Sequence, residues 1–171
     1  MSGAPEARIV QLPAEAIIAL AAGDLEAANR AAPVTLTPWL AGPESVPTWR
    51  FRARQVVETP IDLGWFTGAL QDVATGAVVG KAGFHAAPDP DGMVEMGYGV
   101  DPAFRRRGYA RAALLLLLER ARSEPSVHTL RATVSPDNTS SLALIAQFPF
   151  VEVGEQWDDE DGLETIYEMP V

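Results

Sequence analysis

The sequence holds a short run of cations between a strand-like segment and a predicted helix. It consists of Arg105, Arg106, Arg107, Gly108, Tyr109, Ala110 and Arg111. Backbone N–H groups at the start of a helix stabilise an anion together with the helix dipole, and glycine permits the positive φ that a close phosphate requires. The run therefore predicts a site for a phosphate-bearing ligand. A solvated helix start is the alternative, because the run has neither a P-loop ending nor the Gly-x-Gly-x-x-Gly spacing of a dinucleotide site.

Charge is distributed unevenly along the chain, which bears on the kind of ligand. The net charge is −10 at pH 7, yet residues 102–122 contain six arginines and one acid, a net +5. Residues 151–168 contain eight acids and no lysine or arginine. Proteins that bind duplex nucleic acid need excess cations to neutralise its phosphates. We therefore expect a small polyanionic ligand and no nucleic acid as a partner.

The residue types that are missing or rare exclude several classes of protein. The chain has no cysteine and only two histidines, His85 and His128. Disulfide scaffolds, thiolate metal sites and cysteine nucleophiles are excluded, and we expect no metal site. The N-terminus lacks a basic region followed by a long apolar stretch, and the longest aliphatic run, residues 114–118, is too short to span a bilayer. We expect a cytoplasmic protein that does not bind membranes.

Length and composition predict one globular domain, because the chain has 171 residues of which 47% are hydrophobic and 21% are charged. Strands are expected at residues 7–12, 63–72, 77–85, 93–100, 127–134, 150–156 and 163–171, and helices at residues 14–22, 24–30, 109–122 and 138–147. Residues 48–58 fit a strand or a helix. This order predicts an α+β fold in which helices flank one mixed, mostly antiparallel sheet of about six to seven strands.

Two parts of the sequence resemble the GNAT N-acetyltransferase superfamily, whose signature is Arg/Gln-x-x-Gly-x-Gly/Ala at the start of a helix. Residues 95–110, which read EMGYGVDPAFRRRGYA, are similar to the strand and loop that carry it. Asn138 and Ser141, followed by residues 150–154, resemble the second landmark of the family. The likeness covers about residues 63–171 and is closest in style to the RimJ/RimL-like branch.

The chain departs from the family pattern at three positions. Arg106 stands where the loop often has a glycine, and Pro149 stands where a glycine often precedes the late phenylalanine. Ile145 stands where many members have a tyrosine that acts as the general acid. A tyrosine acid at that position is therefore excluded.

The resemblance implies a single GNAT-like domain with splayed central strands that uses acetyl-CoA as cosubstrate. Residues 63–171 would be the acyl-CoA-binding core and residues 1–62 a helical, loop-rich portion on the acceptor side. The diphosphate would bind the loop of residues 105–110, with Arg111 among the cations. The pantetheine arm would pair with Tyr98, Gly99 and Val100, where the glycines suggest a bulge or else only relieve crowding.

The second landmark has two interpretations. Asn138 would bind a pantetheine amide, and Ser141 would contact the sulfur, hold a water molecule or serve as a weak acid. Asn138 is equally suited to cap its own helix, which requires no ligand.

Acyl transfer to an amine needs a group that removes a proton from the amine. Glu95, on the central strand, is the first candidate for this base, and His85, near the end of the adjacent strand, is the second. Alternatively, Glu95 is simply a charged residue on an exposed strand face, and His85 is a hydrogen-bonded polar residue at a strand end.

The function implied is transfer of acetyl to a primary amine, either a small molecule or a protein N-terminus, by a monomer or homodimer. Transfer of another acyl group, such as succinyl, is one alternative. A noncatalytic acyl-CoA-binding regulatory module is another.

Overall fold

Seven strands form one mixed sheet in the computed structural model, which describes residues 3–171. The strands are β1 (Ala7–Val10), β2 (Gly68–Asp72), β3 (Val78–Phe84), β4 (Met93–Val100), β5 (Thr129–Val134), β6 (Val151–Asp158) and β7 (Gly162–Pro170), in the order β1-β2-β3-β4-β5-β7-β6. The β4–β5 pair is parallel, whereas β1–β2, β2–β3, β5–β7 and β6–β7 are antiparallel. The predicted α+β fold with a mixed, mostly antiparallel sheet is thereby confirmed.

The helices predicted over residues 14–22, 24–30, 109–122 and 138–147 are present with small differences in their bounds. They are α1 (Ala14–Ala21), α2 (Leu25–Ala31), α3 (Val46–Glu58), α4 (Tyr109–Ser123) and α5 (Thr139–Ile145), with short 3-10 turns η1 (Pro60–Trp65) and η2 (Pro102–Phe104). The ambiguous residues 48–58 belong to α3, because Trp49, Arg52 and Val56 recur at helical spacing and are buried. None of the described helices has the length and apolarity needed to cross a bilayer.

The described residues gather into two compact units. The first contains the residues through Ala87 together with Gly97–Leu117, and the second contains Pro88–Met96 and Leu118–Val171. Strand β4 and helix α4 each contribute their two halves to different units. The functional division into residues 1–62 and 63–171 stays a prediction.

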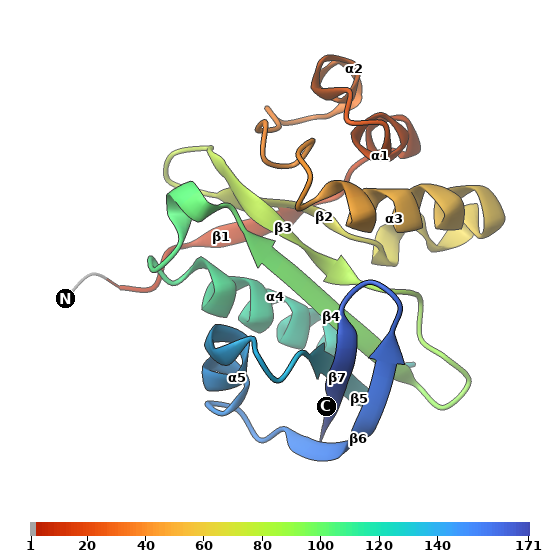
Figure 1. Cartoon of the computed structure of the whole chain (residues 1–171), viewed down its shortest axis with the longest axis vertical. Helices are drawn as coiled ribbons and strands as arrows, with labels where there is room; N and C mark the ends of the chain where they lie inside the picture. The colour runs from red at the N-terminus through yellow and green to blue at the C-terminus, as the bar shows by residue number, and fades with distance from the viewer. Residues whose placement is uncertain (1–2) are drawn as a thin grey trace. The chain divides into compact units, whose positions relative to one another are not determined.

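In the first unit, helices α1, α2 and α3 lie on one side of strands β1, β2 and β3, and the beginning of α4 lies on the other side (Figure 1). The apolar core there is formed by side chains of α1, α3 and the segments before α1 and before α3, including Leu12, Ile17, Leu20, Leu40 and Trp49. The Trp49 indole is buried and donates a hydrogen bond to the carbonyl oxygen of Leu40 at 2.8 Å. This core fixes the segment between α2 and α3 on the helical side of the sheet.

The prediction of a strand over residues 63–72 was wrong in its first part. Residues Pro60–Trp65 form η1, and β2 begins at Gly68. The reason is local hydrogen bonding: the N–H of Asp62 donates to the carbonyl of Thr59, and the N–H of Phe66 donates to that of Leu63. These turns use the backbone groups that a strand would need.

In the second unit, the first half of β4 pairs in parallel with β5, Met93–Glu95 against Thr129–Arg131, and β5 pairs with β7. The hairpin of β6 and β7 turns at Gly162, whose φ is +76°. Helix α5 starts after Asn138, whose side-chain oxygen accepts a hydrogen bond from the N–H of Ser141. The splay of the central strands stays a prediction.

Candidate active site

The loop before α4 contains two residues with positive φ, Arg106 at 61° and Gly108 at 89°. Arg106 therefore adopts the left-handed conformation that glycine adopts freely, which costs a residue with a Cβ roughly 1–2 kcal/mol. Residues of opposite backbone hand in succession turn their N–H groups toward one side and form a concave anion site. At Gly108 a Cβ would also lie 3.0 Å from Cδ of Pro5, so glycine meets both a conformational and a spatial requirement.

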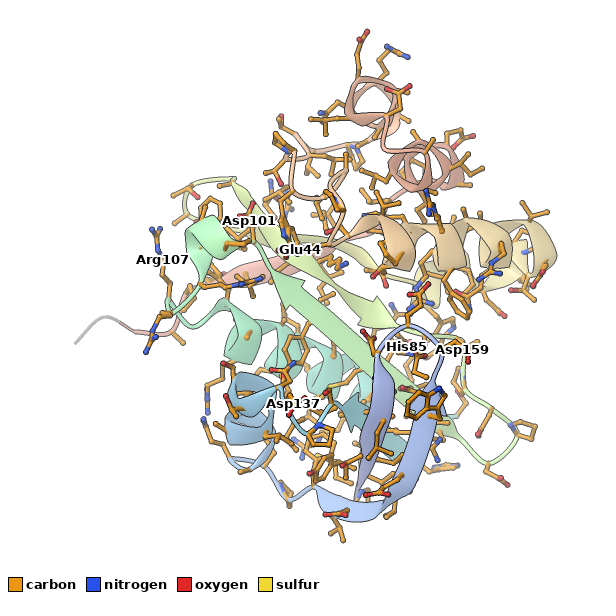
Figure 2. The ribbon with its side chains drawn as sticks, viewed as in Figure 1. Glu44, His85, Asp101, Arg107, Asp137 and Asp159 are labelled. Atoms are coloured by element: carbon orange, nitrogen blue, oxygen red, sulfur yellow. The ribbon has the colours of Figure 1, made fainter. Side chains whose placement is uncertain are left out.

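This loop and the first turn of α4 carry exposed cations. Arg105, Arg106, Arg107 and Arg111 are all exposed, and Figure 2 labels Arg107 at the outer edge of the loop. The Arg107 guanidinium carbon lies 5.6 Å from the centre of the Phe104 ring. Guanidinium groups match phosphate oxygens in bidentate geometry, so the residues of this loop fit a diphosphate.

Arg105 is held by two groups of the first unit. Its Nε donates to the carbonyl oxygen of Val100 at 3.0 Å, and its Nη2 lies 3.5 Å from Oε2 of Glu44. The same Oε2 accepts a hydrogen bond from the indole of Trp39 at 3.0 Å. Glu44 therefore connects the segment after α2 to the cationic loop.

Tyr109 anchors the first turn of α4 to the end of β2. Its hydroxyl donates to Oδ2 of Asp72 at 2.8 Å, while Oδ1 of Asp72 accepts from both the N–H and the hydroxyl of Thr75 at 2.7 Å. The hydrogen bonds from Thr75, and then that from Tyr109, hold the pKa of Asp72 below its usual value. Burial raises the pKa of Tyr109, and the Asp72 carboxylate raises it further. The hydroxyl of Tyr109 is therefore a neutral donor that positions the loop.

The glycines in the second half of β4 make room for side chains from elsewhere in the first unit. A Cβ on Gly97 would lie 2.8 Å from Nε2 of His85. A Cβ on Gly99 would lie 3.3 Å from both Cε of Lys81 and Cη2 of Trp39. Relief of crowding, the simpler interpretation of these glycines, is therefore what the contacts support. Tyr98 and Val100 flank Gly99 and are half-buried.

The three candidates for proton transfer, His85, Glu95 and Ser141, are divided between the two units. His85 belongs to the first unit, where its carbonyl oxygen accepts from Nη1 of Arg52 at 3.2 Å and from Nε2 of Gln55 at 2.7 Å (Figure 2). Glu95 belongs to the second unit, where its half-buried carboxylate accepts a hydrogen bond from the hydroxyl of Thr133 at 2.7 Å. Ser141 also belongs to the second unit and is half-buried.

Asn138 acts as a helix cap. Its Oδ1 accepts from the N–H of Ser141 at 3.1 Å, the bond that an N-cap residue makes. The structure therefore shows Asn138 as the cap of α5, and its contact with a pantetheine amide stays a prediction.

Lys81, a residue of β3 that is only 8% exposed, was not among the predicted site residues. Its Nζ donates to the hydroxyl of Thr48 at 2.9 Å and lies 5.5 Å from the centre of the Trp39 ring. Burial, and then the charge of Arg52, lower the pKa of Lys81 to about 8, while the charge of Glu44 opposes this shift. A signal was present in the sequence, because Lys81 is the only lysine of the chain and lies among apolar and small residues.

No cluster of three or more histidine, aspartate or glutamate side chains suited to a metal ion occurs within residues 3–171.

Comparison with known proteins gives a consistent result. The model of a family described as acetyltransferase (GNAT) domain matches residues 14–151. The uncharacterized N-acetyltransferase YjdG of Bacillus subtilis is 32% identical over 74 residues, which cover 43% of this chain and 44% of that protein. The chain spans about half the length of the curated relatives it matches.

Two solved structures show the same fold. The ribosomal-protein-S5-alanine acetyltransferase from Vibrio fischeri has a TM-score of 0.63 and 17% identity, and the match covers 99% of this chain and 94% of that one. The microcin C7 self-immunity acetyltransferase MccE, solved with acetyl-CoA and AMP, has a TM-score of 0.63 and 14% identity, over 97% and 93% of the two chains.

Proposed function

The chain belongs to the GNAT acetyltransferase family, and from this premise we propose that it transfers the acetyl group of acetyl-CoA to a primary amine. The observation that carries the proposal is the loop before α4, where Arg106 and Gly108 have positive φ beside exposed arginines. Such a loop suits a diphosphate, which acetyl-CoA supplies. Placement in the RimJ/RimL-like branch is part of the proposal, supported by the likeness to the Vibrio fischeri enzyme.

Each part of the proposed acetyl-CoA site has a distinct role. The backbone of residues 105–110 binds the diphosphate, while Arg105, Arg106, Arg107 and Arg111 supply countercharge. The backbone of Tyr98, Gly99 and Val100 pairs with the amides of the pantetheine arm. Asn138 and Ser141 contact the arm nearer the sulfur.

The thioester supplies an activated acetyl carbon and a thiolate leaving group. An uncharged amine attacks this carbon, the carbon–sulfur bond breaks, and the thiolate leaves with the electron pair of that bond. Glu95 accepts the proton that the amine loses, directly or through water, and its hydrogen bond from Thr133 fixes the carboxylate. His85 is the second candidate for this proton, and Ser141 is the candidate donor to the thiolate. The acceptor is a small-molecule amine or a protein N-terminus.

A thermal melt with and without acetyl-CoA tests the proposal. At 100 times the dissociation constant, binding stabilises the folded state by about 2.7 kcal/mol, or roughly 5–10 °C for a chain of this size. Gly108→Ala forces a Cβ into the loop and should abolish the shift. Gly76→Ala is the matched control, because Gly76 also has a positive φ, 74°, but lies in the β2–β3 turn.

The two variants separate loss of binding from loss of folding. Both introduce similar backbone strain, so both should melt at a lower temperature than the parent. Only Gly76→Ala should keep the acetyl-CoA shift. A parent protein that does not respond to saturating acetyl-CoA would overturn the proposal.

A further inference from the structure

Lys81 occupies an unusual position for a lysine. The chain has twelve arginines and this one lysine, and the lysine is buried on β3. Taking an ammonium group out of water is costly unless a counterion compensates it. In the part of the chain that the structure describes, Lys81 forms no ion pair with a carboxylate, and its hydrogen-bond partner is the neutral hydroxyl of Thr48.

The hydrogen-bonding capacity of Lys81 is incompletely used by the protein. An ammonium group has three N–H donors. The Thr48 hydroxyl accepts one, and the face of the Trp39 ring accounts for a second. One donor remains for a ligand. Glu44, the acid whose charge acts on Lys81, has its Oε2 engaged by Trp39 and Arg105.

Lys81 lies over the strand that the proposed function assigns to pantetheine. Its Cε would be 3.3 Å from a Cβ on Gly99, while His85 would be 2.8 Å from a Cβ on Gly97. Gly97 and Gly99 are two residues apart on β4, so they face the same side at a separation of about 7 Å. One base candidate and one buried cation therefore lie against neighbouring positions on the same face of β4.

From this arrangement we propose that Lys81 binds a carboxylate of the acceptor, so that the acceptor is a free amino acid rather than a polyamine. A free amino acid carries an amine that can take the acetyl group and, one carbon atom away, a carboxylate that a buried ammonium group can bind. The second cation, Arg52 on α3, acts electrostatically on Lys81 and makes the region more attractive to an anion. This inference rests on the proposed acetyl transfer, and it names the acceptor class for the same site.

Matched pairs of acceptors test the inference. The panel is the free L-amino acids beside their carboxamides, for example L-alanine and L-alaninamide, which differ in the anionic group. The parent protein should prefer the acid by about 10-fold or more in kcat/KM, the effect of a charge-assisted hydrogen bond. Lys81→Met should remove this preference by raising KM for the acid about 10-fold while KM for the amide stays within about 2-fold.

A purely structural role of Lys81, such as holding Trp39 and Thr48 in place, gives a different result. Lys81→Met would then change KM for the acid and the amide equally, which would overturn the inference. A parent that uses acid and amide equally well would overturn it without any variant. Lys81→Arg keeps the charge and should retain a preference for the acid, which covers the case in which the methionine variant does not fold.

A binding measurement separates this inference from the proposed function. With lysine labelled with 13C at Cε alone, the chain gives a single signal from that carbon, because Lys81 is its only lysine. In protein saturated with CoA, which cannot donate acetyl, L-alanine should shift this signal and L-alaninamide should not. If acetyl-CoA binds but neither probe shifts the signal, the inference is wrong and the proposed function stands. If acetyl-CoA does not bind at all, both are wrong.

Discussion

Oε2 of Glu44 lies 3.5 Å from Nη2 of Arg105, so a carboxylate contacts an arginine of the loop that we propose for the diphosphate. The ligand phosphates would compete with Glu44 for this guanidinium. Glu44→Gln should therefore tighten acetyl-CoA binding by about 1.5- to 5-fold, since an exposed ion pair contributes about 0.2–1 kcal/mol. Isothermal titration calorimetry measures the change. Glu26→Gln, which removes a similarly exposed ion pair with Arg30, is the control and should leave the affinity unchanged. Weaker binding by Glu44→Gln would show instead that Glu44 positions Arg105.

Arg106→Gly should separate folding from binding. The substitution relieves the left-handed strain at φ 61°, partly offset by the greater freedom of glycine in the unfolded chain. We expect the free energy of unfolding in urea to rise by up to about 1 kcal/mol and the affinity for acetyl-CoA to fall, because a cation is lost. Arg107→Gly, at a residue without positive φ, should lower both quantities. A fall in stability for Arg106→Gly would contradict the argument.

Glu95→Gln should lower kcat by at least about 100-fold, the usual contribution of a general base, while acetyl-CoA affinity stays within about 2-fold. Steady-state kinetics combined with calorimetry distinguishes the two effects. Thr133→Val removes the hydrogen bond from Thr133 to Glu95 and leaves the carboxylate in place, so it should cause a smaller loss of kcat than Glu95→Gln. Full activity of Glu95→Gln would remove Glu95 from the mechanism and leave His85 as the candidate.

Lys81 should give the stability of the protein a distinctive pH dependence. Its pKa is about 8 in the folded chain against 10.5 for an unperturbed lysine, because burial and Arg52 outweigh Glu44. Between these two pH values the unfolded chain binds the proton that the folded chain has released, so stability rises with pH. From pH 8 to pH 10.5, the free energy of unfolding of the parent should therefore rise by up to ~3 kcal/mol relative to that of Lys81→Met. Urea denaturation across this range measures it, and a constant difference would contradict it.

The fold was largely readable from the sequence because local signals agreed with the tertiary structure. The strand predicted over residues 93–100 is β4, and the helix predicted over residues 109–122 begins at Tyr109 as α4. The exception is the segment before β2, where apolar Leu63 and Trp65 suggested a strand although they are half-buried in a 3-10 turn. Apolar content alone does not distinguish these two conformations.

The site was readable only in part, and the reason is physical. The cationic loop is contiguous, so its residue types and spacing are visible in the sequence. The contacts of Lys81 with Trp39 and Thr48 join residues more than thirty positions apart, and these depend on packing. The same holds for Thr133, which was not predicted to contact Glu95.

The burial of Lys81 has a practical consequence for following the reaction. The chain carries no thiol, and its single lysine amine is shielded from solvent. Reagents that colour the free thiol of released CoA will react with product alone, and amine-directed dyes will report the acceptor with little background from lysine side chains. Thiol and lysine side chains of the protein therefore contribute little to assays that detect its proposed product and its proposed acceptor.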